Sequence, residues 1–164
     1  MPSDFTIRHA APDDIPALAA VERECFPAAE AATEADFRSR VAVYPDYFWL
    51  LFDGGRLVSF VDGFVSAEPD LTDEMYANAD LHTPDGEWQM IFGVNTIPAC
   101  RRQGCAALLL DAAIADARAQ GRKGVVLTCK DALIHYYAKF GFVNEGVSAS
   151  VHGNVTWYQM RLTF

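Results

Sequence analysis

Short stretches in which apolar and polar residues alternate, or in which apolar residues run together, predict strands in the first half of the chain. Asp53-Gly54-Gly55 separates two of these stretches and is typical of a hairpin turn, because glycine accepts the positive φ that such turns require. The predicted strands cover 5–10, 47–52, 56–65 and 87–96. The polar, acidic segment 66–86 predicts a long loop or a short helix.

Two helices are predicted between these first strands. Pro12-Asp13-Asp14 opens the first helix with carboxylates in its first turn, and apolar residues then recur at helical spacing until Pro27 ends it. Thr33 and Asp36 have the spacing of a capping box, which predicts a second, short helix through Val41.

Helices alternate with strands in the second half of the chain. An alanine- and leucine-rich segment predicts a helix over 105–120 that stops at Gly121. The apolar run 124–128 predicts a strand buried on both faces. A further helix is expected over 131–140, followed by two strands. These last strands cover 143–151 and 155–164. The order of elements predicts one α/β domain over residues 1–164 with a mixed sheet.

Composition excludes several classes of partner. The net charge of −9 argues against a nucleic acid, and the apolar runs fall far short of the ~20 residues that cross a bilayer. Met1-Pro2-Ser3-Asp4 lacks the basic-then-apolar order of a signal peptide, so we expect a soluble cytoplasmic protein. The spacing of the cysteines and histidines predicts neither a disulfide nor a metal site.

The charges are unevenly distributed along the chain. Segment 57–100 has eight carboxylates and no lysine or arginine, whereas 101–139 has seven basic residues against three acidic ones. The first segment therefore suits a cation and the second an anion, although a solvated acidic surface would give the same pattern.

One segment, 94–106, combines a predicted strand, a loop and the start of a helix. The first amides of a helix have no internal partner, and together with the helix dipole they form an anion site. Gly104 and Ala106 are small enough for a pyrophosphate to approach the backbone, and Arg101 and Arg102 add positive charge at the rim.

The motif Arg101-x-x-Gly104-x-Ala106 between a strand and a helix resembles the acetyl-CoA loop of the GCN5-related N-acetyltransferase (GNAT) superfamily. Tyr137-x-x-x-Gly141-Phe142 resembles a later motif of that superfamily. A narrower resemblance, over 127–142, is to the arylalkylamine (serotonin) N-acetyltransferases.

The resemblance implies the GNAT fold: a central mixed, mostly antiparallel sheet of about seven strands, flanked by about four helices. Coenzyme A would lie between two parallel strands that splay apart, here 87–96 and 124–128. The first of these would pair through its backbone with the pantetheine arm. The residues implied to bind the cofactor are Phe92, Gly93, Val94, Arg101, Arg102, Gln103, Gly104, Cys105, Ala106 and Ala107.

The resemblance also implies that Tyr137 protonates the departing thiolate of coenzyme A. A tyrosine with a pKa near 10 stays protonated at pH 7 and can share its proton with a thiolate. Tyr136 points about 100° away on the same helix, so it serves as the internal control. A core tyrosine is the alternative interpretation of Tyr137.

The chain departs from the arylalkylamine pattern at the strand before the loop, where two histidines are expected and Trp88 and Met90 occur. Neither can take a proton, so the sequence names no general base. Trp88, Met90 and Phe26 are expected to line an apolar acceptor site, with Glu30 or Asp46 as a nearby carboxylate.

The leading hypothesis is acetyl transfer from acetyl-CoA to a small primary amine by direct attack in a ternary complex, with no metal. Two alternatives stay open: a non-catalytic, acyl-CoA-binding regulatory module, and an enzyme that acetylates a peptide or protein N-terminus. The expected partner is a small-molecule amine, with neither a nucleic acid nor a membrane, and a homodimer stays open.

Overall fold

The computed structural model describes residues 5–164, so Met1–Asp4, on which the expectation about a signal peptide depends, lie outside the described residues. The chain forms two compact units. Unit 1 contains the described residues up to Gly63 together with Gly93–Ala113, and unit 2 contains Phe64–Phe92 and Ile114–Phe164. The chain therefore passes from one unit to the other within two strands and one helix.

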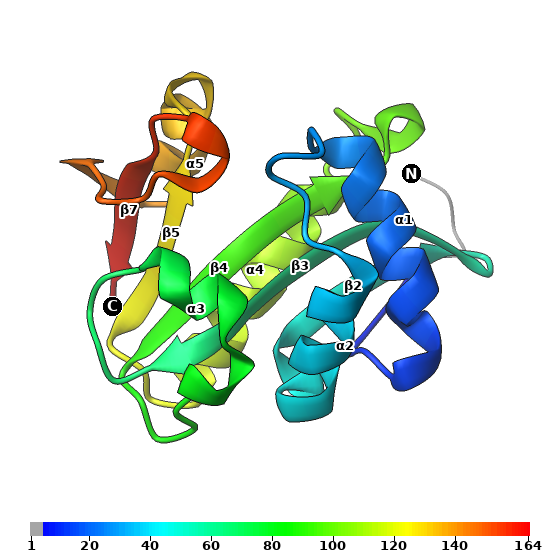
Figure 1. Cartoon of the computed structure of the whole chain (residues 1–164), viewed down its shortest axis with the longest axis horizontal. Helices are drawn as coiled ribbons and strands as arrows, with labels where there is room; N and C mark the ends of the chain where they lie inside the picture. Colours follow the sequence, from blue (N-terminus) through cyan, green and yellow to red (C-terminus); the bar gives the residue numbers. More distant parts are fainter. Residues whose placement is uncertain (1–4) are drawn as a thin grey trace. The chain divides into compact units, whose positions relative to one another are not determined.

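Seven strands hydrogen-bond in the order β1-β2-β3-β4-β5-β7-β6 (Figure 1). The pair β4–β5 is parallel, and the pairs β1–β2, β2–β3, β5–β7 and β6–β7 are antiparallel. This sheet confirms the mixed α/β architecture expected from the sequence. The strands are β1 Phe5–Arg8, β2 Phe48–Asp53, β3 Arg56–Ser66, β4 Trp88–Thr96, β5 Gly124–Cys129, β6 Val143–Val147 and β7 Tyr158–Thr163.

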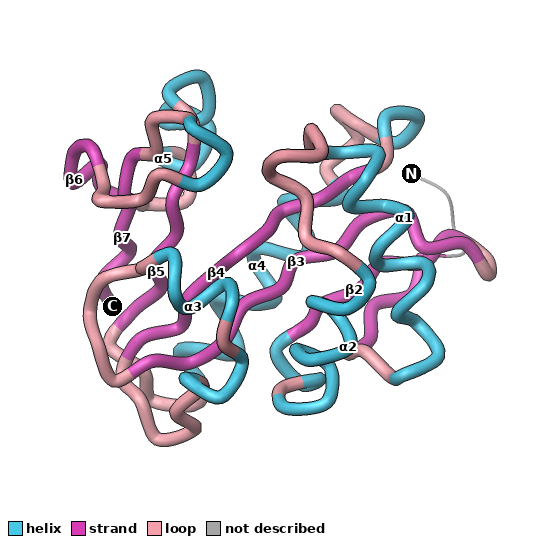
Figure 2. The backbone as a smooth tube through the Cα atoms, viewed as in Figure 1, coloured by secondary structure: helices cyan, strands magenta, loops and turns pink. Residues whose placement is uncertain are grey.

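The first helices of unit 1 begin where the sequence predicts them. A 3₁₀ turn, η1 Pro12–Asp14, leads into α1 Ile15–Cys25, and α2 Glu34–Val43 is followed by η2 Pro45–Tyr47. The Thr33 hydroxyl accepts from the Asp36 amide at 3.1 Å, and the Asp36 carboxylate accepts from the Thr33 amide at 2.8 Å, which confirms the predicted capping box. Figure 2 shows the loop between α1 and α2 and the tight turn between β2 and β3, where Gly54 has φ +64°.

Aromatic side chains fill the core of unit 1. Phe37 of α2 packs edge-to-face on Phe48 and Phe60, at 6.3 and 5.7 Å between ring centroids, and Tyr44 stacks on Phe48 at 6.1 Å. The helices α1 and α2 cover one face of the strands of unit 1. Helix α4 spans Cys105–Ala119, and its first half lies on the other face of these strands (Figure 1). These aromatics are therefore core residues of unit 1.

Unit 2 contains the shorter helical segments. The acidic segment forms α3 Asp73–Ala77 and η3 Ala79–Leu81, and the helix predicted over 131–140 is divided into η5 Asp131–Leu133 and α5 Ile134–Ala138. The final strands are shorter than predicted, because the loops on either side of the 3₁₀ turn η6 His152–Asn154 occupy the end of the first range and the start of the second. In β5, Val125, Val126 and Leu127 are buried, as expected for a strand covered on both faces.

Candidate functional site: a helix start, a buried acid and a buried tyrosine

The loop before α4 turns sharply and is fixed by its own side chains. After η4 Pro98–Cys100 the backbone adopts positive φ at Arg102 (+62°) and at Gly104 (+81°). Arg101 Nε donates to the Thr96 carbonyl at 3.0 Å, and the Gln103 side-chain amide donates to the Ala99 carbonyl at 3.3 Å. These bonds tie the loop to the end of β4, so the first turn of α4 is presented from a constrained backbone.

The first turn of α4 exposes amides that the helix itself does not use. The Leu108 amide donates to the Gly104 carbonyl at 3.1 Å, which makes it the first donor of the helical ladder. The amides of the three residues before it therefore have no intrahelical acceptor. A Cβ built on Gly104 meets nothing within 4 Å, so space is open beside this backbone. The unused amide donors, the positive end of the helix dipole and the open space beside Gly104 together fit a diphosphate.

Strand β4 pairs with β5 over only part of its length. The parallel register runs from Trp88 opposite Gly124 to Ile91 opposite Leu127, whereas β4 itself continues to Thr96. The strands thus stop pairing just before Phe92–Val94, the backbone expected to bind the pantetheine arm.

Gly93 makes the close approach that a glycine inside a strand suggests. A Cβ at this position would lie 3.0 Å from Asp62 Oδ1, 3.0 Å from Asn95 Nδ2 and 3.7 Å from Glu22 Oε1. Three polar side chains from three elements therefore converge on one strand residue of unit 1.

These side chains belong to a buried polar cluster. Asp62 Oδ2 accepts from Arg40 Nη1 at 2.9 Å, with both side chains buried. Glu22 is 6% exposed, and its Oε2 accepts from the Ala32 amide at 2.9 Å. Burial and the nearby Asp62 raise the pKa of Glu22 to about 7, against smaller lowering effects of the Ala32 amide and Arg40. Glu22 can therefore exchange a proton near neutral pH.

Sequence reasoning missed this acid. Glu30 and Asp46 were the carboxylates expected near the acceptor, and the structure leaves Asp46 exposed. Glu22 lies on the apolar face of α1, where a single charged residue among apolar neighbours is a weak signal. Asp62 and Asn95, which it meets at Gly93, are 40 or more positions away in the chain, so no local motif connects them.

Tyr137 is the buried residue of α5. Burial raises its pKa, and the neighbouring Cys129, Tyr136 and Tyr76 raise it further. The hydroxyl therefore stays protonated at neutral pH and is a proton donor rather than a base. Tyr136 is half-buried, with its ring 5.4 Å from that of Phe140, so the two tyrosines differ in environment as expected.

Cys129 beside Tyr137 is a neutral thiol. Burial raises its pKa to about 11, with a smaller effect of Asp131, and its Sγ contacts Met160 Sδ at 3.5 Å. A thiol with this pKa is a poor nucleophile at pH 7. This environment favours direct transfer over an acyl-cysteine route.

Comparison with known proteins decides the family. The Acetyltransferase (GNAT) family profile matches residues 15–142, about three quarters of the chain. The chain belongs to the acetyltransferase (GNAT) family. This membership confirms the resemblance that Arg101–Ala106 and Tyr137–Phe142 indicated, together with the fold that it implied.

Individual relatives of this GNAT chain cover most of its length. Serotonin N-acetyltransferase of Mesocricetus auratus is 28% identical over 154 residues, which are 92% of this chain and 73% of that protein. The structure of the GphF GNAT-like decarboxylase in complex with isobutyryl-CoA is 25% identical and covers 96% of this chain and 98% of its own, with a TM-score of 0.83. The loading GNATL domain of CurA from Lyngbya majuscula is 16% identical, covers 97% of both chains and has a TM-score of 0.85.

The residues expected to bind the acceptor differ in how far their side chains are exposed. Met90 is fully buried, and Phe26 follows α1 with its side chain partly exposed. The Arg161 guanidinium lies 4.5 Å from the Trp88 ring centroid, so one face of that indole already holds a cation. An apolar wall at Trp88 fits this geometry better than a cation-binding face.

An aromatic row in unit 2 was not recognised from the sequence. The Phe92 ring lies 4.9 Å from Phe64 and 4.7 Å from Tyr76, and Tyr76 stacks on His152 at 5.7 Å. The Tyr76 hydroxyl is 3.2 Å from Thr128 Oγ1 at the end of β5. The side chain of Phe92 therefore packs among aromatic rings. This packing does not involve the Phe92 backbone, which is expected to pair with the pantetheine arm.

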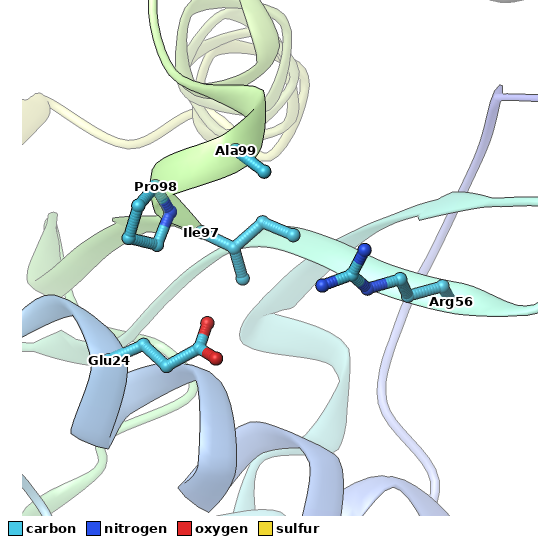
Figure 3. Close-up of a pocket in the computed structure, with 5 residues that line it drawn as sticks. All are labelled: Glu24, Arg56, Ile97, Pro98 and Ala99. Atoms are coloured by element: carbon cyan, nitrogen blue, oxygen red, sulfur yellow. The ribbon is translucent and has the colours of Figure 1, made fainter.

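A shallow hollow of about 310 Å³ in unit 1 contains none of the predicted site residues (Figure 3). Its lining comes from α1, β3 and the segment that precedes the loop before α4: Glu24, Arg56, Ile97, Pro98 and Ala99. In Figure 3 the carboxylate of Glu24 and the guanidinium of Arg56 point toward each other across Ile97.

Two further findings concern residues 5–164. The four cysteines are free thiols, and no group of three or more histidine, cysteine, aspartate or glutamate side chains in this part of the GNAT chain could hold a metal ion. No helix within the same range is long and apolar enough to span a membrane.

Proposed function

We propose that this GNAT chain transfers the acetyl group of acetyl-CoA to the nitrogen of a primary amine. The observation that carries the proposal is the start of α4, where unused amides and the open side of Gly104 fit a diphosphate. Membership of the acetyltransferase family supports the same assignment. Arg102 adds positive charge to the rim of this loop.

The backbone at Gly93 and Val94 would hold the pantetheine arm as an added strand. The end of the β4–β5 register at Ile91 supports this arrangement, because β4 continues beyond it. Such binding would fix the direction of the acyl group and reduce the entropic cost of bringing it to the amine.

Tyr137 would supply the proton that the departing sulfur needs. The amine nitrogen forms a bond to the acetyl carbon, the carbon–sulfur bond breaks, and its electron pair leaves with sulfur. Burial raises the pKa of Tyr137, so its hydroxyl holds the proton until a thiolate develops.

A small aromatic amine is the acceptor that we propose. The likeness to serotonin N-acetyltransferase of Mesocricetus auratus supports an amine of this kind, and Phe26, which is partly exposed, would contribute apolar surface for its ring. A protein N-terminus is the alternative acceptor, and a regulatory module without transfer is the alternative function.

A second enzymatic function follows from the likeness to the GphF GNAT-like decarboxylase. Such a function would remove carbon dioxide from a carboxylated acyl-CoA and would need no amine. The buried Glu22 argues against it, because its ionised carboxylate would repel a second carboxylate near Gly93. Release of carbon dioxide without free thiol would identify this activity.

A thiol-release assay tests the proposal. Acetyl-CoA is mixed with the protein and one of 2-phenylethylamine, aniline, a polyamine or a short peptide, and we expect amine-dependent release of coenzyme A. Tyr137→Phe should lower kcat by about 10²- to 10⁴-fold, the usual contribution of a positioned proton donor, with little change in acetyl-CoA affinity. Tyr136→Phe is the matched control and should stay near the unaltered rate. Equal effects at both positions would refute the role of Tyr137.

A further inference from the structure

The polar cluster at Gly93 contains one carboxylate that the fold does not neutralise. Asp62 is bound by Arg40, whereas no ion pair involves Glu22 among residues 5–164. The Ala32 amide holds Glu22 Oε2 at 2.9 Å, which leaves Oε1 as the oxygen that approaches Gly93. A buried carboxylate is costly, so its retention without a cation needs a reason.

Asn95 gives an independent indication that this cluster binds a polar group. Its side chain is fully buried, its Nδ2 amide acts on the Glu22 carboxyl and lowers that group's pKa, and its Oδ1 has no hydrogen-bond partner. The Nδ2 atom lies against Gly93, on the same side as Glu22 Oε1. A buried carbonyl oxygen without a partner costs about 1–3 kcal/mol, and Oδ1 therefore favours a ligand that donates a hydrogen bond to it.

The position of the cluster connects it to the reaction. Gly93 belongs to the backbone that would hold the pantetheine arm, and only a hydrogen atom separates its Cα from Glu22 and Asn95. A side chain of any size would cover these groups, so glycine keeps them next to the strand that would carry the acyl group.

We propose that Glu22 is the general base of the acetyl transfer and that Asn95 positions the attacking amine beside it. This inference depends on the function proposed above. As the nitrogen–carbon bond forms, the amine proton moves to the Glu22 carboxylate, while the electron pair of the carbon–sulfur bond leaves with sulfur, which takes a proton from Tyr137. The products are the N-acetylated amine and free coenzyme A, and solvent returns the proton from Glu22 to Tyr137.

The charges around Glu22 suit this role. Asp62 on β3 raises its pKa, while Arg40 on α2, the Ala32 amide and the Asn95 amide on β4 lower it, and burial outweighs all three. The carboxyl of Glu22 interacts also with the Cys25 thiol on α1, whose pKa burial keeps above its ordinary value. A base with a pKa of about 7 combines an ionised fraction at neutral pH with useful proton affinity.

The test compares Glu22→Gln with Glu24→Gln. Both changes remove a carboxylate from α1, but Glu24 is exposed whereas Glu22 is buried in the cluster. Steady-state rates with acetyl-CoA and 2-phenylethylamine are measured from pH 5.5 to 9, together with acetyl-CoA binding by calorimetry and unfolding by circular dichroism.

We expect the unaltered protein to show kcat rising with pH through an apparent pKa near 7, as Glu22 loses its proton. Glu22→Gln should lower kcat by about 100-fold or more and abolish this rise, while it keeps its acetyl-CoA affinity and still folds. Glu24→Gln should retain the rate and the profile.

Four outcomes would contradict the inference, and the last of them concerns only the assignment of Asn95. A Glu22→Gln variant that keeps kcat within twofold would show that Glu22 is structural, while the acetyltransferase function would stand. A parallel loss of acetyl-CoA binding or of folding would assign Glu22 to the scaffold. If the unaltered protein binds acetyl-CoA but releases thiol with none of the amines, both the proposed function and this inference fail. Asn95→Leu should raise the KM for the amine; an unchanged KM would remove Asn95 from the site.

Discussion

Arg40 Nη1 donates to Asp62 Oδ2 at 2.9 Å, and both side chains are almost completely buried. This pair compensates one of the two carboxylates that lie against Gly93, and so leaves Glu22 as the acid that can exchange its proton. Because burial of ions is costly, a pair of this kind is sensitive to the loss of either partner.

Replacement of Arg40 by methionine should therefore destabilise the fold. We expect a loss of about 3–5 kcal/mol in the free energy of unfolding, because Asp62 stays buried without a counter-ion. Urea denaturation followed by circular dichroism measures it. The exposed pair Lys123–Glu87, at 3.0 Å, provides the control, and Lys123→Met should cost less than about 1 kcal/mol. Similar losses of unfolding free energy in the two variants would contradict the burial of the Arg40–Asp62 pair.

Glu22 should make the stability of the protein depend on pH. Its pKa is about 7 in the folded state against an ordinary value of 4.5, so the folded state binds the proton more tightly. The unfolded chain releases its proton first as the pH rises, and folding stability is lost between pH 4.5 and 7. The difference of about 2.5 pKa units corresponds to about 3 kcal/mol.

Glu22→Gln removes this titration, so its stability relative to the unaltered protein should rise by about 3 kcal/mol between pH 4.5 and pH 8. Denaturation midpoints of both proteins across this range measure the difference. Parallel curves for the two proteins would show that Glu22 titrates at its ordinary pKa.

Gly104→Ala tests the diphosphate site with a control at the other end of the same helix. Gly104 and Gly121 have φ values of +81° and +76°, and a Cβ at either position meets nothing within 4 Å. Alanine should thus cost about 1–2 kcal/mol of stability at both positions through backbone strain alone. Only Gly104→Ala should also weaken acetyl-CoA binding, about tenfold, because the methyl group enters the approach to the first amides of α4. Equal affinities of the two variants in calorimetry would place the diphosphate elsewhere.

The fold could be predicted from sequence wherever a local rule decides the conformation. The Thr33–Asp36 capping box, the hairpin glycine Gly54 and the helix stop at Gly121 all occur as expected, and both glycines have positive φ. The structure of segment 131–140 was less predictable. Its pattern of apolar and polar residues fits a single helix as well as it fits the 3₁₀ turn and short helix that form.

The site was predictable only in part, for the same reason. The loop before α4, to which we assign the diphosphate, is one continuous segment whose spacing predicts its chemistry. Tyr137 likewise belongs to a local motif, which ends five positions later at Phe142. Glu22 and Asn95 acquire their properties from burial and from each other, across 73 positions of sequence. No periodicity or motif encodes the pKa of a carboxylate that depends on which elements the fold brings together.

Gly93→Ala tests whether the cluster is as tightly packed as its distances indicate. The new methyl group would lie 3.0 Å from both Asp62 Oδ1 and Asn95 Nδ2. Neither neighbour can move easily, because Arg40 holds Asp62 and the Asn95 carbonyl accepts from the Ser59 hydroxyl at 2.6 Å. We expect a destabilisation of about 1–3 kcal/mol from overpacking, which exceeds the gain from a less flexible unfolded chain.

The control for this change is Gly55→Ala in the β2–β3 turn, where a Cβ meets nothing within 4 Å and φ is not positive. This variant should be neutral or slightly more stable in urea denaturation, because alanine restricts the unfolded chain without a clash. If Gly93→Ala is as stable as Gly55→Ala, the cluster has room for a methyl group. Glycine at position 93 would then not be needed to keep Glu22 and Asn95 against the strand, and the close approach of these side chains would not explain why a glycine occurs there.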